Sequence, residues 1–253
     1  MDSLKKLVLL SAFSFSFVSC GLVGGAAEEE PEELPVGNYE HTYYTISDTL
    51  AADPELENRI RPHINAVQEL TARVLTRSDR GIERGQPEGA LGNMVADLIR
   101  SRASAEMGRN VDVAVINNGG LRTPLPEGEI TIGMIYELMP FENIIVVQEH
   151  TGRQLRQMAD QIAAVGGEPV SGMRMRISGD GASQVMVGSE PIDPDRTYLV
   201  ATNNWMADGG GPITTLHQPE ERHNLQVLIR DAIIDYLDSR ESISPETDRR
   251  VRN

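Results

Sequence analysis

The chain has 253 residues, and its 40% hydrophobic and 24% charged residues are typical of a globular protein rather than a disordered one. Asp and Glu outnumber Lys and Arg by 38 to 23, so the formal net charge is −15 at pH 7. This balance argues against non-specific binding of nucleic acid polymers, which needs many cationic side chains. The single cysteine, Cys20, excludes an intrachain disulfide and a thiolate metal cluster.

The first residues resemble the signal sequence of a bacterial lipoprotein. Two lysines precede a short apolar stretch over residues 7–18, and Cys20 follows closely. The stretch is shorter than the roughly 20 apolar residues that span a membrane. We expect residues 1–19 to be a signal peptide and Cys20 to carry a lipid that anchors the protein in the cell envelope, in the periplasm or at the cell surface. A simple secretory signal with an incidental cysteine is the alternative.

Residues 20–38 consist mainly of Gly, Ala, Glu, Pro and a few apolar residues, with no hydrophobic period. We predict that they form a flexible acidic linker between the lipid and the folded domain. Because acidic tracts after a lipidated cysteine direct surface export in some bacteria, an export signal is a second interpretation. The domain is then expected over residues 39–253.

The first part of this domain predicts a strand and two helices. Residues 40–47 are rich in Tyr and Thr and favour a strand. Asp53 and Pro54 are a typical helix start, and apolar residues recur on one face to about residue 77. A second helix over 88–107 has an inward face formed by Leu91, Val95, Leu98 and Ile99.

In the rest of the chain, strand and helix patterns alternate irregularly. Predicted strands cover residues 111–117, 143–150, 170–178, 183–188 and 197–203, and predicted helices cover 131–139, 151–165 and 223–240. Thr151 and Gln154 match a capping box at the start of one helix. We therefore predict a single α/β domain of the mixed α+β type, with mixed sheets flanked by helices.

Three segments are candidate ligand sites because they combine glycine with polar side chains. The first is Gly92 and Asn93, early in the second predicted helix, where glycine costs about 1 kcal/mol relative to alanine. The second follows strand 111–117 and contains Asn117, Asn118, Gly119, Gly120 and Arg122. The third follows strand 197–203 and contains Asn204, Trp205, Asp208, Gly209 and Gly210.

These residue types suit ligand binding for distinct reasons. Ligands of α/β proteins often bind just past the carboxyl ends of strands, where glycine allows a close backbone approach. Arg122 offers a planar fork of donors, and the only tryptophan suits stacking on a planar base. Taken singly, the segments also fit tight helix packing, a tight turn and a core tryptophan. Together they predict one shared site.

The sequence predicts no metal site and no nucleophilic centre. The five histidines are scattered, and H-E-x-x-H, H-x-H, G-x-S-x-G and Walker A motifs do not occur. His217 and His223 flank Glu220 and Glu221, which are residue types that ligate metals. We expect these four in a solvated polar loop, and no cofactor in this chain.

Six motifs in order resemble the C-terminal domain of the 5′-nucleotidase and UDP-sugar hydrolase family. The motifs read E-x-x-L-G-N-x-x-A-D, N-x-G-G-[IL]-R, G-x-I-T, L-x-P-F-x-N, T-G-x-x-L and A-T-N-x-[FW]-x-A-x-G-G, and the resemblance covers about residues 40–240. The resemblance implies a domain that binds the nucleoside part of a nucleotide. In that family a separate N-terminal metallophosphatase domain holds two metal ions and performs the hydrolysis.

The resemblance also implies roles for individual residues. Phe141 and Trp205 match the two walls of the family's aromatic sandwich for the base, the second of which is normally Phe or Tyr. Asn117 and Arg122 match the residues that contact the base and the ribose side. The remaining expected substrate-binding residues are Gly119, Gly120, Asn204, Asp208, Gly209 and Gly210.

The sequence departs from the family pattern at two positions. Pro87 stands where the family often has an arginine, and Gly211 stands where it has a ribose-binding aspartate. The dimetal motifs D-x-H and G-N-H-[ED] do not occur in the sequence. We therefore expect no catalytic residue and no phosphatase activity in this chain alone, and divalent metal ions only in a partner chain.

Three hypotheses for function follow. The first is the nucleotide-recognition domain of a split 5′-nucleotidase, in which a separate metallophosphatase chain hydrolyses nucleoside 5′-phosphates. The second is a nucleoside-binding lipoprotein with no catalytic partner. The third is a degenerate scaffold domain that kept the fold and lost the site, and a tryptophan packed into the core would favour it.

Overall fold

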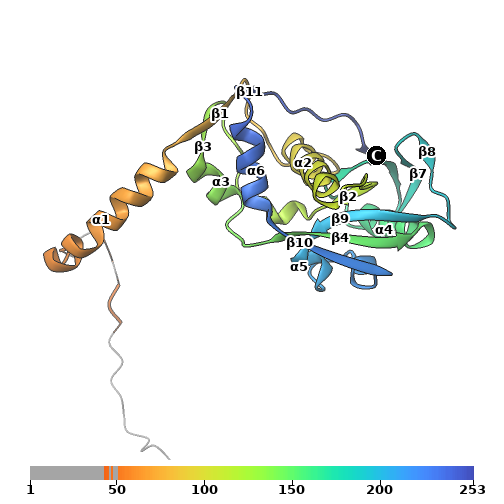
Figure 1. The fold of residues 1–253 in the computed structure, drawn as a ribbon, viewed down its shortest axis with the longest axis horizontal. Coiled ribbons are helices and arrows are strands. Elements are labelled where there is room, and N and C mark those ends of the chain that lie inside the picture. The colour runs from red at the N-terminus through yellow and green to blue at the C-terminus, as the bar shows by residue number, and fades with distance from the viewer. Residues whose placement is uncertain (1–42, 46, 48–50) are drawn as a thin grey trace, which may run out of the picture. The chain divides into compact units, whose positions relative to one another are not determined.

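Three β-sheets with helices packed against them make up the described part of the chain (Figure 1). This computed structural model describes residues 43–45, 47 and 51–253. The predicted signal peptide, the lipidation site Cys20 and the acidic linker lie outside these residues. The strand predicted over 40–47 is wrong for the part that is described, because residues 43–45 and 47 have no regular secondary structure. The predicted mixed α/β class is confirmed.

The largest sheet has five strands in the order β10-β4-β9-β2-β5. In chain order they are β2 (Val113–Val115), β4 (Ile144–Thr151), β5 (Val170–Ser171), β9 (Thr197–Asn203) and β10 (Glu221–Leu228). Strand β9 runs parallel to β2 and antiparallel to β4, with Ile145 opposite Asn203. The carboxyl ends of β2 and β9 and the amino end of β4 therefore meet at the same end of the sheet.

Two smaller sheets complete the strand arrangement. One consists of β1 (Val74–Ser78), β3 (Gly128–Thr131) and β11 (Ser242–Ile243). The other consists of β6 (Met173–Ser178), β7 (Gly181–Val187), β8 (Glu190–Pro191) and β12 (Val251–Arg252). The strand predicted over 170–178 is divided at Gly172, whose φ of +75° suits glycine and ends β5 before β6 begins.

Helices cover both faces of the five-stranded sheet, and each face has its own hydrophobic core. Helices α2 (Ala90–Met107) and α6 (Ile229–Asp238) pack on one face, and α4 (Gly152–Ala164) packs on the other (Figure 1). Alternate residues of β9 point to the two cores, so that Leu199 and Ala201 join the first, and Tyr198 and Val200 join the second.

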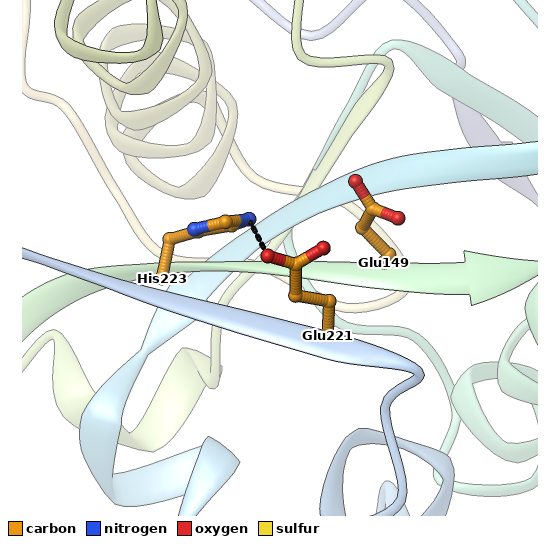
Figure 2. Close-up of side chains that lie close together, drawn as sticks. All are labelled: Glu149, Glu221 and His223. Carbon is orange, nitrogen blue, oxygen red and sulfur yellow. Dashed lines mark ion pairs between the residues drawn. The ribbon is translucent and has the colours of Figure 1, made fainter.

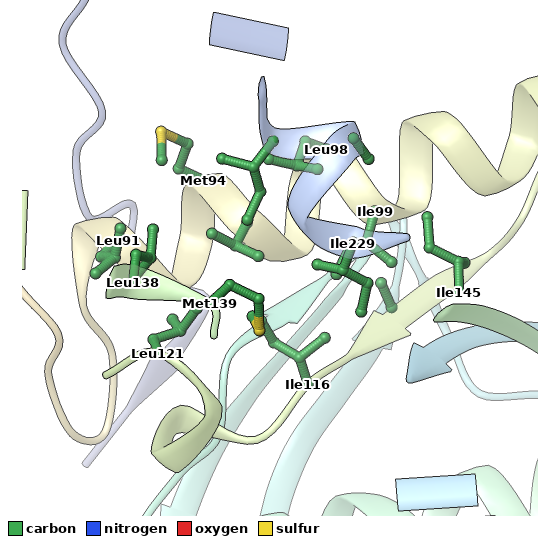
Figure 3. Packing of buried hydrophobic residues seen from close by; sticks show 14 of the residues in the cluster. Leu91, Met94, Leu98, Ile99, Ile116, Leu121, Leu138, Met139, Ile145 and Ile229 are labelled. Carbon is green, nitrogen blue, oxygen red and sulfur yellow. The ribbon is translucent and has the colours of Figure 1, made fainter. Parts of the chain in front are cut away.

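The first core contains the inward face predicted for α2. Figure 3 shows Leu91, Leu98 and Ile99 of this helix, which meet side chains from the sheet and from α6, among them Ile145 and Ile229. Each fully buried side chain of this kind stabilises the fold by about 1.5–3 kcal/mol. The core thus fixes α2 on the sheet, next to the strand ends that carry the polar segments.

Side chains cap the first turns of several helices. Asp53 Oδ1 accepts hydrogen bonds from the amides of Glu55 and Leu56 at 2.9 and 3.3 Å, at the start of α1 (Pro54–Thr71). Thr151 and Gln154 form the predicted capping box of α4. Helix α3 (Ile132–Leu138) is capped by the Thr131 hydroxyl and ends just before Pro140, as predicted.

Helix α1 differs from its prediction in length. It ends at Thr71 rather than near residue 77, because Val74–Ser78 pairs with β3 and β11 instead. None of its residues is buried, although its apolar residues do recur on one face. Among the described residues, none of the helices combines the length and the apolar character that crossing a lipid bilayer requires.

The helix predicted over 223–240 is wrong in its first part. Residues 221–228 form β10, which pairs with β4 through Glu221↔Glu149 and His223↔Val147, and only Ile229–Asp238 is helical. The apolar spacing of Leu225 and Leu228 continues the helical period, but pairing with β4 satisfies the backbone of this segment. This correction also places Glu221 and His223 on a strand, where a polar loop was predicted.

Candidate ligand-binding site

One cleft of about 320 Å³ lies where β2, β4 and β9 meet at the same end of the sheet. A volume of this size is at the lower end of that found for small-molecule sites. Seven residues line it: Asn117, Gly119, Gly120, Arg122, Phe141, Asn143 and Trp205. The structure thus brings together six of the predicted site residues from three separate segments.

Asn117 and the turn that follows it line one part of the cleft. Asn117 Oδ1 accepts a hydrogen bond of 2.9 Å from the Asn203 side chain, which ties the end of β2 to the end of β9. The turn that follows is the short 3₁₀ helix η1 (Asn118–Gly120). A Cβ at Gly120 would lie only 3.1 Å from Nδ2 of the Asn117 side chain, so the glycine leaves space for this side chain.

A buried carboxylate, that of Glu168, holds the same turn through a hydrogen bond to its backbone. Glu168 accepts a 2.6 Å hydrogen bond from the amide of Asn118, whose own side chain donates to the carbonyl of Gly85. Burial raises the pKa of Glu168, while the hydrogen bond from Asn118 acts in the opposite direction. Glu168 therefore orients the backbone amides of the turn without lining the cleft itself.

Arg122 lies against one aromatic wall of the cleft. Its guanidinium carbon is 5.0 Å from the centroid of the Phe141 ring, a cation–π distance worth about 0.5–1 kcal/mol at an exposed site. Within the described residues it forms no ion pair, although the chain is strongly acidic. Its planar donors thus remain available to the oxygens of a ligand.

The backbone that carries Phe141 is held by Arg230, which the sequence analysis missed. This buried arginine of α6 directs Nη1 towards the carbonyls of Met139 and Phe141, at 3.5 and 3.4 Å. Its guanidinium also stacks on Tyr136, 4.3 Å from the ring centroid. The sequence did contain a signal for it, because Arg230 interrupts the apolar stripe of the last helix.

Trp205 forms the other aromatic wall and is not a core residue. It is 47% exposed, in the short helix α5 (Asn204–Ala207) that follows β9. Its ring lies against the glycine turn, since a Cβ at Gly210 would be 2.3 Å from two indole carbons. The interpretation of Trp205 as a core tryptophan is therefore wrong.

Four other predicted site residues shape the loop without lining the cleft. Asn204 Oδ1 accepts a 2.9 Å hydrogen bond from the amide of Ile144, and Asp208 forms a 2.5 Å ion pair with Arg222. Gly209 has a φ of +105° and open space around it. Gly210 packs under Trp205 as described. Asn143 lines the cleft but was not among the predicted site residues, although it is the last residue of the L-x-P-F-x-N motif.

The first polar segment has a packing role. A Cβ at Gly92 would lie 2.7 Å from the Pro169 ring, so this glycine permits close contact between α2 and the chain before β5. Asn93 is buried and donates to Glu88 at 2.6 Å and to the carbonyl of Glu246. Tight helix packing is thus the correct interpretation for these two residues.

One cluster of potential metal ligands occurs among the residues that the structure describes. It consists of Glu149, Glu221 and His223, on the neighbouring strands β4 and β10. It contains two of the four residues that were predicted to lie in a polar loop. His217 lies apart from it, in the 3₁₀ helix η2 (Thr214–His217).

Comparison with known proteins identifies the family. Residues 67–218 match the family model described as 5′-nucleotidase, C-terminal domain. This match covers more than half of the chain, which therefore belongs to the 5′-nucleotidase C-terminal domain family.

Individual relatives match only with part of their own length. Endonuclease YhcR of Bacillus subtilis is 34% identical over 127 residues, which are 48% of this chain and 10% of YhcR. The cell wall protein Lmo0130 of Listeria monocytogenes is 29% identical over 196 residues, 67% of this chain and 25% of that protein. The 5′-nucleotidase precursor of Thermus thermophilus superposes with a TM-score of 0.68 and 25% identity, over 78% of this chain and 42% of that structure. The chain thus spans a quarter or less of these two curated relatives.

Proposed function

We propose that the cleft binds the nucleoside part of a nucleotide, with the base between Phe141 and Trp205. The observation that carries this proposal is that two aromatic side chains from distant segments line one cleft, beside an arginine that forms no ion pair with any described residue. Stacking of a base on an aromatic side chain contributes about 1–3 kcal/mol. The amides of Asn117 and Asn143 offer donors and acceptors to the edge of the base.

Arg122 is proposed to bind oxygens of the ribose or the phosphate. In the absence of a ligand its guanidinium covers part of the Phe141 ring. A planar base stacks on the same aromatic surface, so we expect the guanidinium to move off the ring towards the ligand when a nucleotide enters. Binding would thus exchange one cation–π contact for charge-assisted hydrogen bonds, which are shorter and stronger.

The cleft is proposed to recognise the substrate while a separate metallophosphatase chain hydrolyses the phosphoester. None of the seven lining residues is a carboxylic acid, histidine, lysine or cysteine, so the lining offers no side chain for general acid–base or nucleophilic chemistry. Two-metal hydrolysis would come from the partner, which would hold the divalent ions. Family membership supports the hydrolysis of nucleoside 5′-phosphates as the joint reaction.

The proposed location is outside the cytoplasm, in the cell envelope. A lipid on Cys20 would tether the domain to the membrane, in the periplasm or at the cell surface. A relative that bears the name of a cell wall protein supports this location. The position of Trp205 in the same cleft as Phe141 argues against the degenerate scaffold.

The test uses the only tryptophan as the reporter. The full chain is titrated with adenosine, AMP and a UDP-sugar while the fluorescence of Trp205 is recorded. We expect saturable quenching that is lost in Phe141→Leu and weakened in Arg122→Ala. The matched control is Arg59→Ala, because Arg59 is also exposed but lies on α1, outside the cleft.

The possible outcomes separate the hypotheses. Quenching together with phosphate release that depends on an added metallophosphatase would support the split enzyme. Quenching without such release would indicate a nucleoside-binding lipoprotein. If the folded protein responded to none of the three ligands, the proposal that this cleft binds a nucleoside would be refuted.

A further inference from the structure

We propose that strands β4 and β10 carry a binding site for one divalent transition-metal ion, formed by Glu149, Glu221 and His223 (Figure 2). Glu149 and Glu221 are direct partners across the antiparallel pair. His223 follows Glu221 by two residues and so projects from the same face of the strand. One ligand atom from each side chain lies within 4.8 Å of the other two.

The spacing of these atoms fits a metal ion after a small adjustment. His223 Nε2 and Glu221 Oε1 are 3.4 Å apart (Figure 2). Bonds of about 2.0–2.2 Å in a tetrahedral site place two ligand atoms about 3.4 Å from each other. These two atoms thus already have the spacing of a ligand pair. The third ligand atom, on Glu149, lies within 4.8 Å of both, so a rotation of the Glu149 side chain would bring it closer to a shared ion.

The histidine nitrogen in this cluster is buried and lies near a carboxylate oxygen. His223 Nε2 is shielded from solvent and accepts or donates no hydrogen bond among the described residues. A buried polar atom without a partner is unfavourable, because it has lost its hydrogen bonds to water. A metal bound to Nε2 would remove this cost, because the neutral imidazole nitrogen offers its lone pair to the ion.

The charges around the cluster also favour a cation. Two carboxylates directly opposite each other on paired strands repel. Among the described residues, Arg109 is a cationic neighbour of this pair. Its Nη2 lies 2.9 Å from Glu149 Oε1, and its side chain is half exposed. Glu221 is 60% exposed and pairs with no arginine or lysine in the described part of the chain. Arg109 therefore offsets one of the two charges and competes with an ion for Glu149.

The ligand types select the class of metal. One imidazole nitrogen with two carboxylate oxygens is a set that Zn²⁺ and its transition-metal neighbours use, whereas Mg²⁺ and Ca²⁺ prefer oxygen ligands alone. Three protein ligands leave a fourth position for water. An ion at this place would clamp β10, the outermost strand of the five-stranded sheet, to β4. The site is separate from the cleft and does not depend on the proposed function.

The test measures metal binding directly on the full chain, without an affinity tag and after removal of metal with a chelator. Calorimetric titration with Zn²⁺ is expected to give one saturable site per chain, and Co²⁺ is expected to develop visible absorption bands. We expect His223→Gln and Glu221→Gln each to weaken Zn²⁺ binding at least tenfold, because loss of an outer partner alone already costs about 10–100-fold. Arg109→Ala is expected to strengthen it several-fold, since a competing cation is removed.

The controls make this result specific. Glu220→Gln removes a carboxylate one residue away that does not belong to the cluster, and Zn²⁺ binding should be unchanged. Mg²⁺ should not compete with Zn²⁺ at equal concentration. Glu221 is largely exposed, so Glu221→Gln decides the matter even if His223→Gln does not fold. The proposal is overturned if no saturable Zn²⁺ binding is found, or if Glu221→Gln binds Zn²⁺ as tightly as the unchanged chain.

Discussion

The substitution Gly210→Ala tests whether the indole of Trp205 forms a wall of the binding cleft. An added Cβ would lie 2.3 Å from two ring carbons of Trp205 and 2.5 Å from its carbonyl oxygen. Contacts this short require the neighbouring atoms to move. Rotation of the indole ring alone does not relieve the contact with the backbone carbonyl of Trp205. The substitution therefore displaces the aromatic wall while it leaves every other lining side chain unchanged.

The expected cost in stability is modest. Overpacking of this kind destabilises a protein by about 1–3 kcal/mol. For a chain of this size, each kcal/mol corresponds to a decrease in Tm of about 2–4 °C. Trp205 is 47% exposed, so we expect the value to fall at the lower end of this range and the protein to remain folded.

The expected effect on ligand binding is larger than the effect on folding. Loss of one stacking partner removes about 1–3 kcal/mol, which corresponds to about fivefold to 150-fold weaker binding. Calorimetric titration with AMP measures this loss without relying on the fluorescence of the displaced residue. Gly81→Ala is the matched control, because the nearest atom to its Cβ is 4.0 Å away. Unchanged AMP affinity in Gly210→Ala would refute the role of Trp205, and an equal loss in Gly81→Ala would assign the effect to folding.

Three further predictions concern buried polar and charged side chains of the fold. Burial lowers the pKa of His150 to about 4, below its ordinary value of 6.5. The unfolded chain therefore binds the proton first, and about 3 kcal/mol of stability is lost as the pH falls from 7 to 4. When the free energy of unfolding in urea is measured against pH, His150→Leu should lack this loss. If His150→Leu loses as much stability between pH 7 and 4 as the unchanged chain, His150 is not its cause. Arg230→Met leaves the carbonyls of Met139 and Phe141 without their donor and should cost about 1–3 kcal/mol, together with weaker AMP binding; unchanged AMP binding would show that Arg230 does not position the Phe141 wall. Asp97→Ala removes the bidentate partner of the buried Arg250, which keeps its ion pair with Asp248, and should cost about 1–3 kcal/mol; an unchanged free energy of unfolding in urea would show that the Asp97 pair is dispensable.

The binding cleft was largely predictable because its residues follow strands. Asn117 and Trp205 come just after β2 and β9, which are parallel neighbours. The carboxyl ends of parallel neighbours meet at one end of the sheet, so two distant segments share a site by topology alone. Phe141, just before β4, joins them because β4 is antiparallel to β9. That placement needed the strand order, and without the family resemblance the sequence did not reveal it.

Other features depend on contacts that a local pattern does not contain. The apolar spacing at Leu225 and Leu228 fits a helix, yet residues 221–228 pair with β4, which lies far away in the sequence. The same pairing brings Glu221 opposite Glu149 and creates the proposed metal site. Arg230 follows the helical period at a buried position, where only the tertiary fold supplies carbonyl partners for it. Periodicity predicts which face of an element is apolar, but not which element covers it.

The departure at position 211 has a structural reason in this chain. A Cβ at Gly211 would lie 3.3 and 3.4 Å from two atoms of the Trp205 ring, which is closer than most Cβ contacts in proteins. The family normally has Phe or Tyr at the position of Trp205 and an aspartate at that of Gly211. The indole is larger than either ring and occupies the space beside residue 211. The glycine and the tryptophan are therefore best understood as one matched pair, in which a broader aromatic wall replaces a polar contact. If the cleft binds a nucleoside as proposed, we therefore expect it to rely on base stacking more than on contacts to the ribose hydroxyls.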